Sequence, residues 1–583
     1  MQPVDLTTLT AICSELRRDW VPARLEQVYQ RDRFCVALNL RTLDRRGWLD
    51  LCWHPQAAHL SMGEPPPRIP DTFTFSQQLK HQLGGLTLTA IAPLDPWERV
   101  LNVQFAKRPG DPVLWHLYVE IMGQYSNVIL ANADNLVITA AHQVNAKQSS
   151  VRQIQTGQPY ERPPSLTDAR PSLEESFETW RDRISLVPGS LRRNLLNSYR
   201  GLSSNLVQSM IQAAELDVNQ PTSSLTDAEW NGLFTQWQFW LKMLKDERFY
   251  PGWTKTGYTV MGWMMTQPVE SVQTLVHQYY FHQRNQQVFT QLRHQISQKV
   301  AAALKKLETK KQDFERRLQQ SGDADQYREQ ADLLMAYVHE WTPGMTQISL
   351  PDFETGEQVQ IKLHPDKTGV QNAQILYKRH QKLRRSRDAI QPLLADVMAE
   401  IEYLQQVEVA IAQLDHYQTP EDLESLADIR SELIQQGYVT DADYRPGQSS
   451  TDPSVNFLHY TTPNGLDVLI GRNNRQNDHL TFRVATDYDL WFHTQEIPGS
   501  HLLLRLEPGM VPDEADLKFT ANLAAYYSRA RQSDGVPVIY TAPKHVYKPK
   551  GAKPGIAIYK HEHVIWGNPQ DAAQCMEQSI SNS

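Results

Sequence analysis

The sequence is poor in cysteine: its 583 residues include only four, and no two of them have the CxxC spacing of a zinc site or a redox motif. We therefore expect reduced, mostly buried thiols at Cys13, Cys35, Cys52 and Cys575. The chain also lacks an apolar run long enough to cross a bilayer, and its first residues, MQPVDLTTLTAICSELRRDW, lack the basic and apolar regions of a signal peptide. These absences predict a soluble, cytoplasmic protein and exclude the disulfide-rich secreted and membrane-spanning classes.

An excess of positive charge is also missing, since the formal net charge is -8 at pH 7. Coating of nucleic acid through bulk charge is therefore not expected, but a local basic face is compatible with this total. At this length the chain is expected to hold several domains, and an apolar fraction of 40% is sufficient for each to have a core.

Changes in hydrophobic periodicity predict an α+β multidomain protein. Alternation in RFCVALNLRT and GWLDLCWHP indicates strands of a mainly antiparallel sheet, and the linker YRPGQSSTDPS marks the clearest domain boundary. The predicted segments are an N-terminal α+β domain (1–170), a helical region with a helix-hairpin-helix (171–271), a long antiparallel coiled-coil arm with a β-hairpin (272–415), an acidic helix and linker (416–454), a C-terminal α+β RNA-binding domain (455–570) and a tail (571–583).

Two stretches of the first half make local predictions. LWHLYVEIMGQYSNVILANADN is predicted to form a helix, a break at Gly123 and a buried strand from Asn127 to Leu130. LRRNLLNSYRGLSSNLVQSMIQAAEL predicts two short helices joined by a turn at Gly201, the second starting near Ser203. A helix-hairpin-helix presents backbone N–H groups to a phosphate in this way, although Ser203 stands where its second glycine is usual. A plain helical spacer is the alternative.

Regular apolar spacing from about Val272 to Leu414 predicts the coiled-coil arm, with a β-hairpin around Thr355-Gly356. Two basic runs accompany it. Such runs are typical of a solvated helix face, but two on one helical hairpin in an acidic chain favour a polyanion such as rRNA. The second run, which contains no acid, supplies the expected contacts Lys378, Arg379, Lys382, Arg384 and Arg385.

The C-terminal domain ends in TAPKHVYKPKGAKPGIAIY, where cations alternate with prolines, glycines and Tyr547. Cationic side chains beside an aromatic ring in a stiff loop suit an RNA backbone with stacking. Lys548, Lys550 and Lys553 are therefore predicted to contact an RNA backbone.

The stretch DLWFHTQEIPGSHLLLR places His493 and His501 on either side of a Pro-Gly turn. A hairpin could bring the two imidazoles together for a metal, with a third ligand such as Asp487 or Asp489. The alternative is a pair of buried, hydrogen-bonded imidazoles, with Trp491 and Phe492 anchoring the strand and the turn shaping an edge that faces RNA or a ribosomal subunit.

At these residues the sequence resembles the NFACT family, whose members include bacterial RqcH and eukaryotic NEMF. DLWFHTQEIPGSHLLLR, AAYYSRAR and KHVYKPKGAKPG are similar to the family's C-terminal domain. EIMGQYSNVIL with VRQIQTGQPYERPP is similar to its N-terminal domain, and LHPDKTGVQNAQILYKRHQKLRR to the junction in its arm. The segment near Gly201 is similar to its helix-hairpin-helix, so the resemblance extends over nearly the whole chain.

The resemblance implies a factor that binds a large (50S) ribosomal subunit still carrying peptidyl-tRNA after a stalled ribosome has split. Such a factor recruits tRNA, in bacteria tRNA-Ala, for mRNA-independent C-terminal tailing that marks the nascent chain for degradation. The implied partners also include rRNA and a helper factor resembling RqcP, with no cofactor and no membrane. Peptide transfer stays with the ribosome, so no catalytic residue is expected.

The resemblance also implies three tRNA-binding residues: Asp5, Glu98 and Arg99. Asp5 and Arg99 match the family pattern. Glu98 stands where the family has aspartate, so its carboxylate lies one methylene further out, and this difference puts the tRNA preference in question.

Two other classes of function stay open. Some family members were first named fibronectin-binding protein A, but this sequence shows neither a signal peptide nor a wall anchor. The family's N-terminal domain resembles formamidopyrimidine-DNA glycosylases, which suggests a nucleic-acid-processing enzyme. Those enzymes use an N-terminal proline followed by glutamate, whereas here Met1 and Gln2 precede Pro3 and Val4 follows it.

Overall fold

The computed structural model describes residues 1–67, 70–164, 169–322, 324–440 and 457–574. It divides into two compact units, Met1–Arg284 and Asn285–Ser583. Within the described residues no helix is long and apolar enough to cross a membrane. The predicted linker YRPGQSSTDPS lies outside the described residues.

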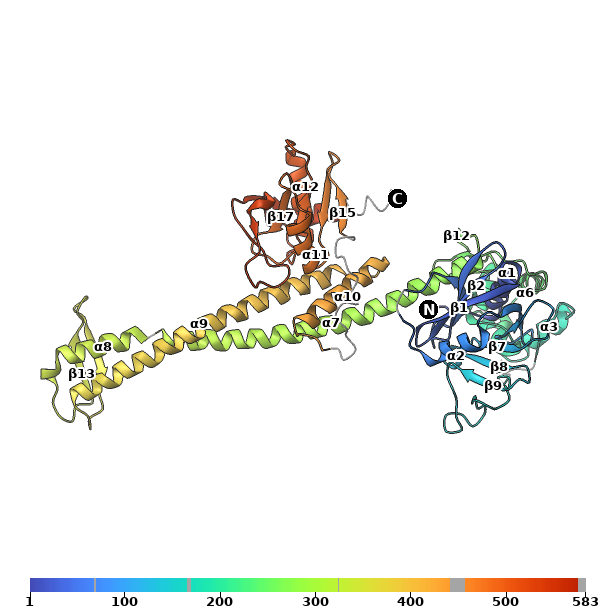
Figure 1. Ribbon diagram of the computed structural model, residues 1–583, viewed down its shortest axis with the longest axis horizontal. Coiled ribbons are helices and arrows are strands. Elements are labelled where there is room, and N and C mark those ends of the chain that lie inside the picture. Colours follow the sequence, from blue (N-terminus) through green and yellow to red (C-terminus); the bar gives the residue numbers. More distant parts are fainter. Residues whose placement is uncertain (68–69, 165–168, 323, 441–456, 575–583) are drawn as a thin grey trace. The chain divides into compact units, whose positions relative to one another are not determined.

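The first unit is built on an antiparallel sheet, which confirms the α+β prediction for the N-terminal domain (Figure 1). In the described part of the chain its strand order is β4-β3-β2-β1-β5-β6-β7-β8-β9. One continuous apolar core joins its inner residues to helix α1 (Leu6–Trp20) and helix α2 (Thr74–Leu83). The strands are β1 (Ala23–Asp32), β2 (Cys35–Arg41), β3 (Arg46–Cys52), β4 (His59–Gly63), β5 (Thr87–Pro93), β6 (Val100–Ala106), β7 (Trp115–Glu120), β8 (Asn127–Asn132) and β9 (Val137–Ala140).

The helix predicted in LWHLYVEIMGQY is wrong, because Trp115–Glu120 forms strand β7 between β6 and β8. The last four residues of β7 are all buried, so its apolar pattern does not alternate and resembles a buried helix. The predicted break at Gly123 and the buried strand that follows are confirmed, the latter as β8.

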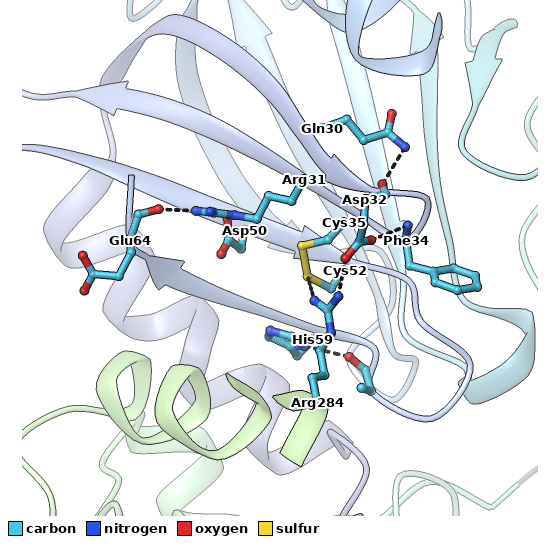
Figure 2. Close-up of a disulfide and its surroundings, with 11 residues drawn as sticks. Gln30, Arg31, Asp32, Phe34, Cys35, Asp50, Cys52, His59, Glu64 and Arg284 are labelled. Atoms are coloured by element: carbon cyan, nitrogen blue, oxygen red, sulfur yellow. Dashed lines mark hydrogen bonds and ion pairs between the residues drawn. A yellow bond between two sulfur atoms is a disulfide. The ribbon is translucent and has the colours of Figure 1, made fainter. Parts of the chain in front are cut away.

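The prediction of reduced thiols is wrong for Cys35 and Cys52, which form a disulfide. Neighbouring strands β2 and β3 place the two residues directly opposite each other, with 4.1 Å between their Cα atoms. Figure 2 shows this disulfide beside Arg284, whose guanidinium reaches both Cys52 and Asp32. Spacing along the chain does not report strand register, so the CxxC test could not find this pair. Cys13 is a free buried thiol as predicted, and burial raises its pKa to about 12.

A helical region completes the first unit and confirms the prediction of two short helices joined by a turn at Gly201. Its core is rich in aromatic side chains, including fully buried Trp180, Trp237 and Trp240. A small sheet of β10 (Gly252–Trp253), β11 (Tyr258–Thr259) and β12 (Gln267–Pro268) follows. The helices are α3 (Phe177–Ser185), α4 (Leu191–Ser198), α5 (Ser204–Ala213) and α6 (Asp227–Asp246).

The second unit contains the predicted arm. Helix α7 (Val272–Ser321) enters it from the first unit, and helix α9 (Gly369–Gln413) runs antiparallel beside α7 (Figure 1). Asn285 of α7 hydrogen-bonds Tyr417 just past α9, while Phe289, Ile296 and Val300 share a core with the end of α9. At the far end, α8 (Ala324–Ala336) packs on the predicted hairpin of β13 (Gln347–Pro351) and β14 (Gln358–Lys362).

The second unit also contains α10 (Pro420–Gln435), from the predicted acidic segment, and the compact C-terminal domain. Among the described residues the domain's main sheet has the order β15-β16-β18-β17-β19-β22 and packs against α12 (Glu514–Tyr526). Asn474–His479 forms helix α11, capped by the side chain of Asn473. The strands are β15 (Leu458–Thr461), β16 (Asp467–Ile470), β17 (Leu490–Thr494), β18 (Leu502–Leu504), β19 (Val536–Thr541), β20 (Val546–Tyr547), β21 (Ile558–Tyr559) and β22 (His563–Gly567).

Candidate nucleic-acid interface

Asp5 lies at the N-terminus of α1, where its side chain joins two helices. One carboxylate oxygen accepts a hydrogen bond from the Thr8 N–H at 2.8 Å and caps α1. The other accepts from the Ser203 hydroxyl at 2.6 Å, and Ser203 itself caps α5. Asp5 is only 6% exposed, so its carboxylate acts as a buried hydrogen-bond acceptor that stabilises the two helix ends.

The turn between α4 and α5 packs directly against the same place. Gly201 has a φ of +77°, and a Cβ atom on it would lie 2.6 Å from Leu6 and 2.8 Å from Trp97. Only glycine fits both the left-handed backbone and this close approach. The hairpin therefore brings Asp5 and the Trp97–Arg99 segment, far apart in the sequence, into one cluster.

Arg99 is the cationic member of this cluster. Its Nη1 donates to the Val4 carbonyl at 3.4 Å, and Val4 immediately precedes Asp5. Burial lowers the pKa of the guanidinium, and the nearby Asp5 carboxylate opposes that shift. Within the described residues Arg99 forms no ion pair within 4.0 Å, and its bond to Val4 uses one of the five N–H donors of the guanidinium. Glu98 lies partly buried in the same turn, where its N–H donates to the Asp95 carbonyl.

The segment after β7 hydrogen-bonds the backbone of Arg99, a contact that the sequence did not predict. The Ile121 N–H donates to the Arg99 carbonyl at 3.0 Å. Its neighbour Glu120 is 1% exposed and accepts two hydrogen bonds from Arg152, at 2.9 and 2.6 Å, and one from the Tyr160 hydroxyl at 2.8 Å. The motifs EIMGQYSNVIL and VRQIQTGQPYERPP thus meet in one buried network, which fixes the strand end beside Arg99.

The arm presents its second basic run to solvent. The five predicted cations are all exposed, and three of them follow helical spacing on one face of α9. Arg379 additionally lies over the Tyr327 ring, with 4.4 Å between the guanidinium carbon and the ring centroid. The exposed cations are Lys378, Arg379, Lys382, Arg384 and Arg385, of which Lys378, Lys382 and Arg385 share the face.

The lysines of the C-terminal loop are placed differently. Lys548 forms an ion pair with Asp478 of α11. The Lys553 ammonium lies between two rings, 4.8 Å from the Tyr403 centroid and 4.6 Å from the Tyr438 centroid, and burial lowers its pKa. Lys550 is exposed and makes no ion pair in the described part of the chain.

The Tyr403 ring that holds Lys553 belongs to α9, so this contact fastens the C-terminal domain to the arm. Beneath it, the Tyr403 hydroxyl and the Asn474 amide both donate to the buried Glu432 carboxylate, at 2.8 and 3.2 Å. Two further pairs, Arg472 with Asp422 and Gln413 with the Tyr527 carbonyl, join the same parts of the second unit.

His493 and His501 do lie together, with 5.3 Å between ring centroids. His501 Nδ1 contacts the Thr481 hydroxyl at 2.7 Å, and burial lowers the pKa of both imidazoles, that of His493 to about 4. Asp489 pairs with Arg505 instead, and the described residues contain no group of three metal-ligating side chains. His501 matches the hydrogen-bonded, buried alternative, whereas His493 is only partly buried and its Nε2 makes no hydrogen bond within the described residues. Trp491 and Phe492 anchor the strand as predicted, at 1% and 0% exposure.

The Pro498-Gly499 turn joins two of the motifs that carried the resemblance. The Arg529 N–H donates to the Pro498 carbonyl at 2.8 Å, and the Ser500 N–H to the Tyr527 carbonyl at 2.9 Å. The segment AAYYSRAR therefore holds the turn in place through these two backbone hydrogen bonds, both of which lie within the C-terminal domain.

Two family models and several known proteins are similar to this chain. The family models described as NFACT N-terminal and middle domains and NFACT protein RNA binding domain match residues 5–452 and 456–559. The Rqc2 homolog RqcH of Bacillus subtilis (strain 168) is 29% identical, over 95% of this chain and 96% of the relative. The Rqc2 homolog RqcH of Streptococcus suis (strain 05ZYH33) is 28% identical, over 96% of each chain. A solved structure, the C-terminal part of the fibronectin/fibrinogen-binding protein from Streptococcus suis, is 27% identical with a TM-score of 0.38, covering 49% of this chain and 98% of that one.

Proposed function

The chain belongs to the NFACT family, and from this premise we propose that it is a ribosome-associated quality-control factor. It binds large ribosomal subunits that carry peptidyl-tRNA and recruits tRNA for mRNA-independent C-terminal tailing. The curated relatives, named Rqc2 homolog RqcH, match over nearly their whole length and support this assignment. The added residue is alanine, delivered by tRNA-Ala with a helper factor resembling RqcP.

The observation that carries the proposal is the cluster around Arg99. A half-buried guanidinium with unused donors, beside an internally hydrogen-bonded Asp5, is a preorganised grip for a phosphate or a base edge. The Asp5 carboxylate favours the charged form of Arg99, against the effect of burial, and holds the ends of the neighbouring helices in place. Glu98 accepts hydrogen bonds from nucleobase amines or ribose hydroxyls. The arm's exposed cations supply the salt-dependent attachment to rRNA.

The proposal assigns no bond-making step to this chain. Peptide transfer takes place in the ribosome, and the factor contributes positioning of tRNA on a subunit that has no mRNA. Asp5, Glu98 and Arg99 are accordingly binding residues.

The test replaces the guanidinium and leaves the arm intact. Arg99→Ala should keep the fold and subunit binding but lose tRNA recruitment and tailing, because it removes the guanidinium that lies beside Asp5. Glu98→Asp, which restores the family pattern, should be tolerated and serves as the matched control. The measurement is pull-down of large subunits from cells, with sequencing of co-purified tRNA and detection of tails on a stalled reporter. Normal tRNA recovery and normal tails with Arg99→Ala would contradict the proposed function.

A further inference from the structure

The first unit carries a row of arginines that the proposed tRNA cluster does not use. Strand register places Arg24 of β1 opposite Arg41 of β2, and Arg41 opposite Arg46 of β3. All three side chains are exposed, on the face opposite to buried Leu25 and Leu40. Directly opposed residues share a face, so the three arginine side chains leave the sheet on one face of three neighbouring strands, with the Arg24 guanidinium directed toward Gly85.

Two carboxylates hold part of this row in place. Glu26 pairs with Arg41 at 3.3 Å and also with Arg46. At the edge of the row, Asp19 pairs with Arg18 and with Arg45, whose guanidinium lies 5.9 Å from the Trp20 ring centroid. Arg24 forms no ion pair among the residues that the structure describes. The result is an ordered set of five arginines, exceeding by one the acidic groups around it, which are Glu15, Asp19, Glu26 and the turn residue Asp44.

Folding alone does not explain this arrangement. Like charges directly opposite each other in an antiparallel pair destabilise a sheet; Glu26 compensates this between Arg41 and Arg46, but Arg24 opposite Arg41 has no ion pair among the described residues. The row also runs against the net charge of -8 of the whole chain. At the tip of the β2–β3 hairpin, Leu43 is 102% exposed, so the turn beside the arginines projects freely into solvent.

We propose that this arginine row binds the phosphate backbone of an RNA stem, as a second RNA surface of the first unit. The cations are all arginine and none is lysine, which suits bidentate recognition of phosphate by a planar, fixed guanidinium. Their regular spacing across neighbouring strands suits a polyanion with regular charge spacing better than the irregular carboxylates of an acidic protein.

The row is separate from the Arg99 cluster. Arg18 and Trp20 lie at the C-terminal end of α1 and Asp5 at its N-terminal end, so the helix separates the two surfaces by about 20 Å at its rise of about 1.5 Å per residue. One structured RNA can therefore contact both at once. The inference rests on the proposed function in taking RNA as the partner, but it assigns a different surface.

The test removes the row and reads RNA binding directly. The full chain carrying Arg24→Gln, Arg41→Gln and Arg46→Gln is compared with the wild-type chain for binding to a fluorescently labelled RNA hairpin. Affinity should fall at least about tenfold at about 50 mM salt, and the slope of log affinity against log salt should decrease by about 2 to 3, since each lost phosphate contact removes about 0.9. The matched control replaces three exposed cations elsewhere in the same unit, Lys107, Arg108 and Lys255, with glutamine and should change affinity less than about twofold.

Two outcomes would overturn the inference. One is unchanged RNA affinity and salt slope in the folded triple variant, with folding checked by thermal unfolding. The other is loss of binding to polyglutamate with RNA binding unchanged, which would make the row a surface for an acidic protein. The proposed function is tested by a different measurement, the tRNA recovered with large subunits from cells expressing Arg99→Ala. A failure of the inference and a failure of the proposed function are therefore distinguishable.

Discussion

The second unit contains two basic segments that look alike in the sequence but differ in the structure. On α9, Lys378 and Arg384 project into solvent. In the loop between β20 and β21, Lys548 pairs with Asp478, and Lys553 is held between two tyrosine rings. Both segments are dense in cations, yet only the arm leaves most of its charge unused.

The difference separates two uses of a cation. An exposed cation with no partner adds to the field that attracts a polyanion, and its contribution falls with salt. A cation that is paired or stacked within the protein holds parts of the chain together, and little of its charge reaches a partner. The arm is therefore expected to supply long-range attraction to rRNA, while the loop first fastens the C-terminal domain to α9 and α10 and offers mainly Lys550 to a partner.

The sharpest test of this comparison reverses charge on the arm. Replacing Lys378, Arg379, Arg384 and Arg385 with glutamate should abolish binding to large subunits at physiological salt. Loss of several phosphate contacts costs about three orders of magnitude in affinity, and the added carboxylates repel the phosphates. The measurement is co-sedimentation of the purified variant with large subunits over a range of salt concentrations.

The matched control makes four charge reversals at exposed cations of the first unit, Lys107, Arg108, Lys147 and Lys255. The control has the same net charge as the arm variant, so it separates a local effect from bulk repulsion. Equal loss of binding in both proteins, or unchanged co-sedimentation of the folded arm variant, would return the arm's cations to the role of a solvated helix face.

Much of the fold could be predicted from periodicity, but contacts between distant residues could not. The arm, the hairpin at Thr355-Gly356 and the helix pair around Gly201 follow from local spacing and turn chemistry, and the structure confirms all three. The prediction of a helix at strand β7 was wrong because a strand buried on both faces has no alternation of apolar and polar residues. The disulfide between Cys35 and Cys52 was not predicted because strand register is set by the whole sheet.

The candidate site shows the same limit. Asp5 and Arg99 could be named from a family resemblance, but nothing local indicates that Asp5 accepts a hydrogen bond from Ser203. The loop lysines show it most clearly. Lys550 and Lys553 are three residues apart in the same Gly/Pro-rich stretch, and only the packing of α9 against the C-terminal domain places Tyr403 beside one of them.

The next effect concerns pH, because His501 is buried and His493 partly buried in the C-terminal domain. Burial lowers the pKa of His493 from 6.5 to about 4, and that of His501 lies well below 6.5 as well. The folded domain therefore binds fewer protons than the unfolded chain between these values. Its stability should be complete above about pH 6.5 and should fall as the pH decreases toward about 4, by about 3 kcal/mol from His493 alone.

The measurement is chemical denaturation followed by near-ultraviolet signals of the C-terminal domain at several pH values. His493→Gln should flatten the profile, because it removes one of the titrating groups. A His416→Gln variant is the control, since His416 is 80% exposed at the end of the arm and its loss should leave the profile unchanged. An unchanged profile in His493→Gln would mean that the imidazole pair does not govern the acid sensitivity of the loop.

The smallest expected effect distinguishes the two lysines of the loop itself. Lys553→Gln removes the cation from between Tyr403 and Tyr438 and should weaken the attachment of the C-terminal domain by about 1 kcal/mol, the usual range for a partly desolvated cation–π pair. Lys553→Arg keeps the cation and should restore most of that loss, whereas Lys550→Gln should leave the attachment unchanged and reduce RNA affinity slightly. Hydrogen exchange of α10 and of the loop reports the attachment, and RNA binding is measured on the same proteins. If Lys553→Gln instead lowered RNA affinity more than Lys550→Gln while exchange stayed the same, the loop would be using its charge as the arm does, and the distinction between the two segments would be wrong.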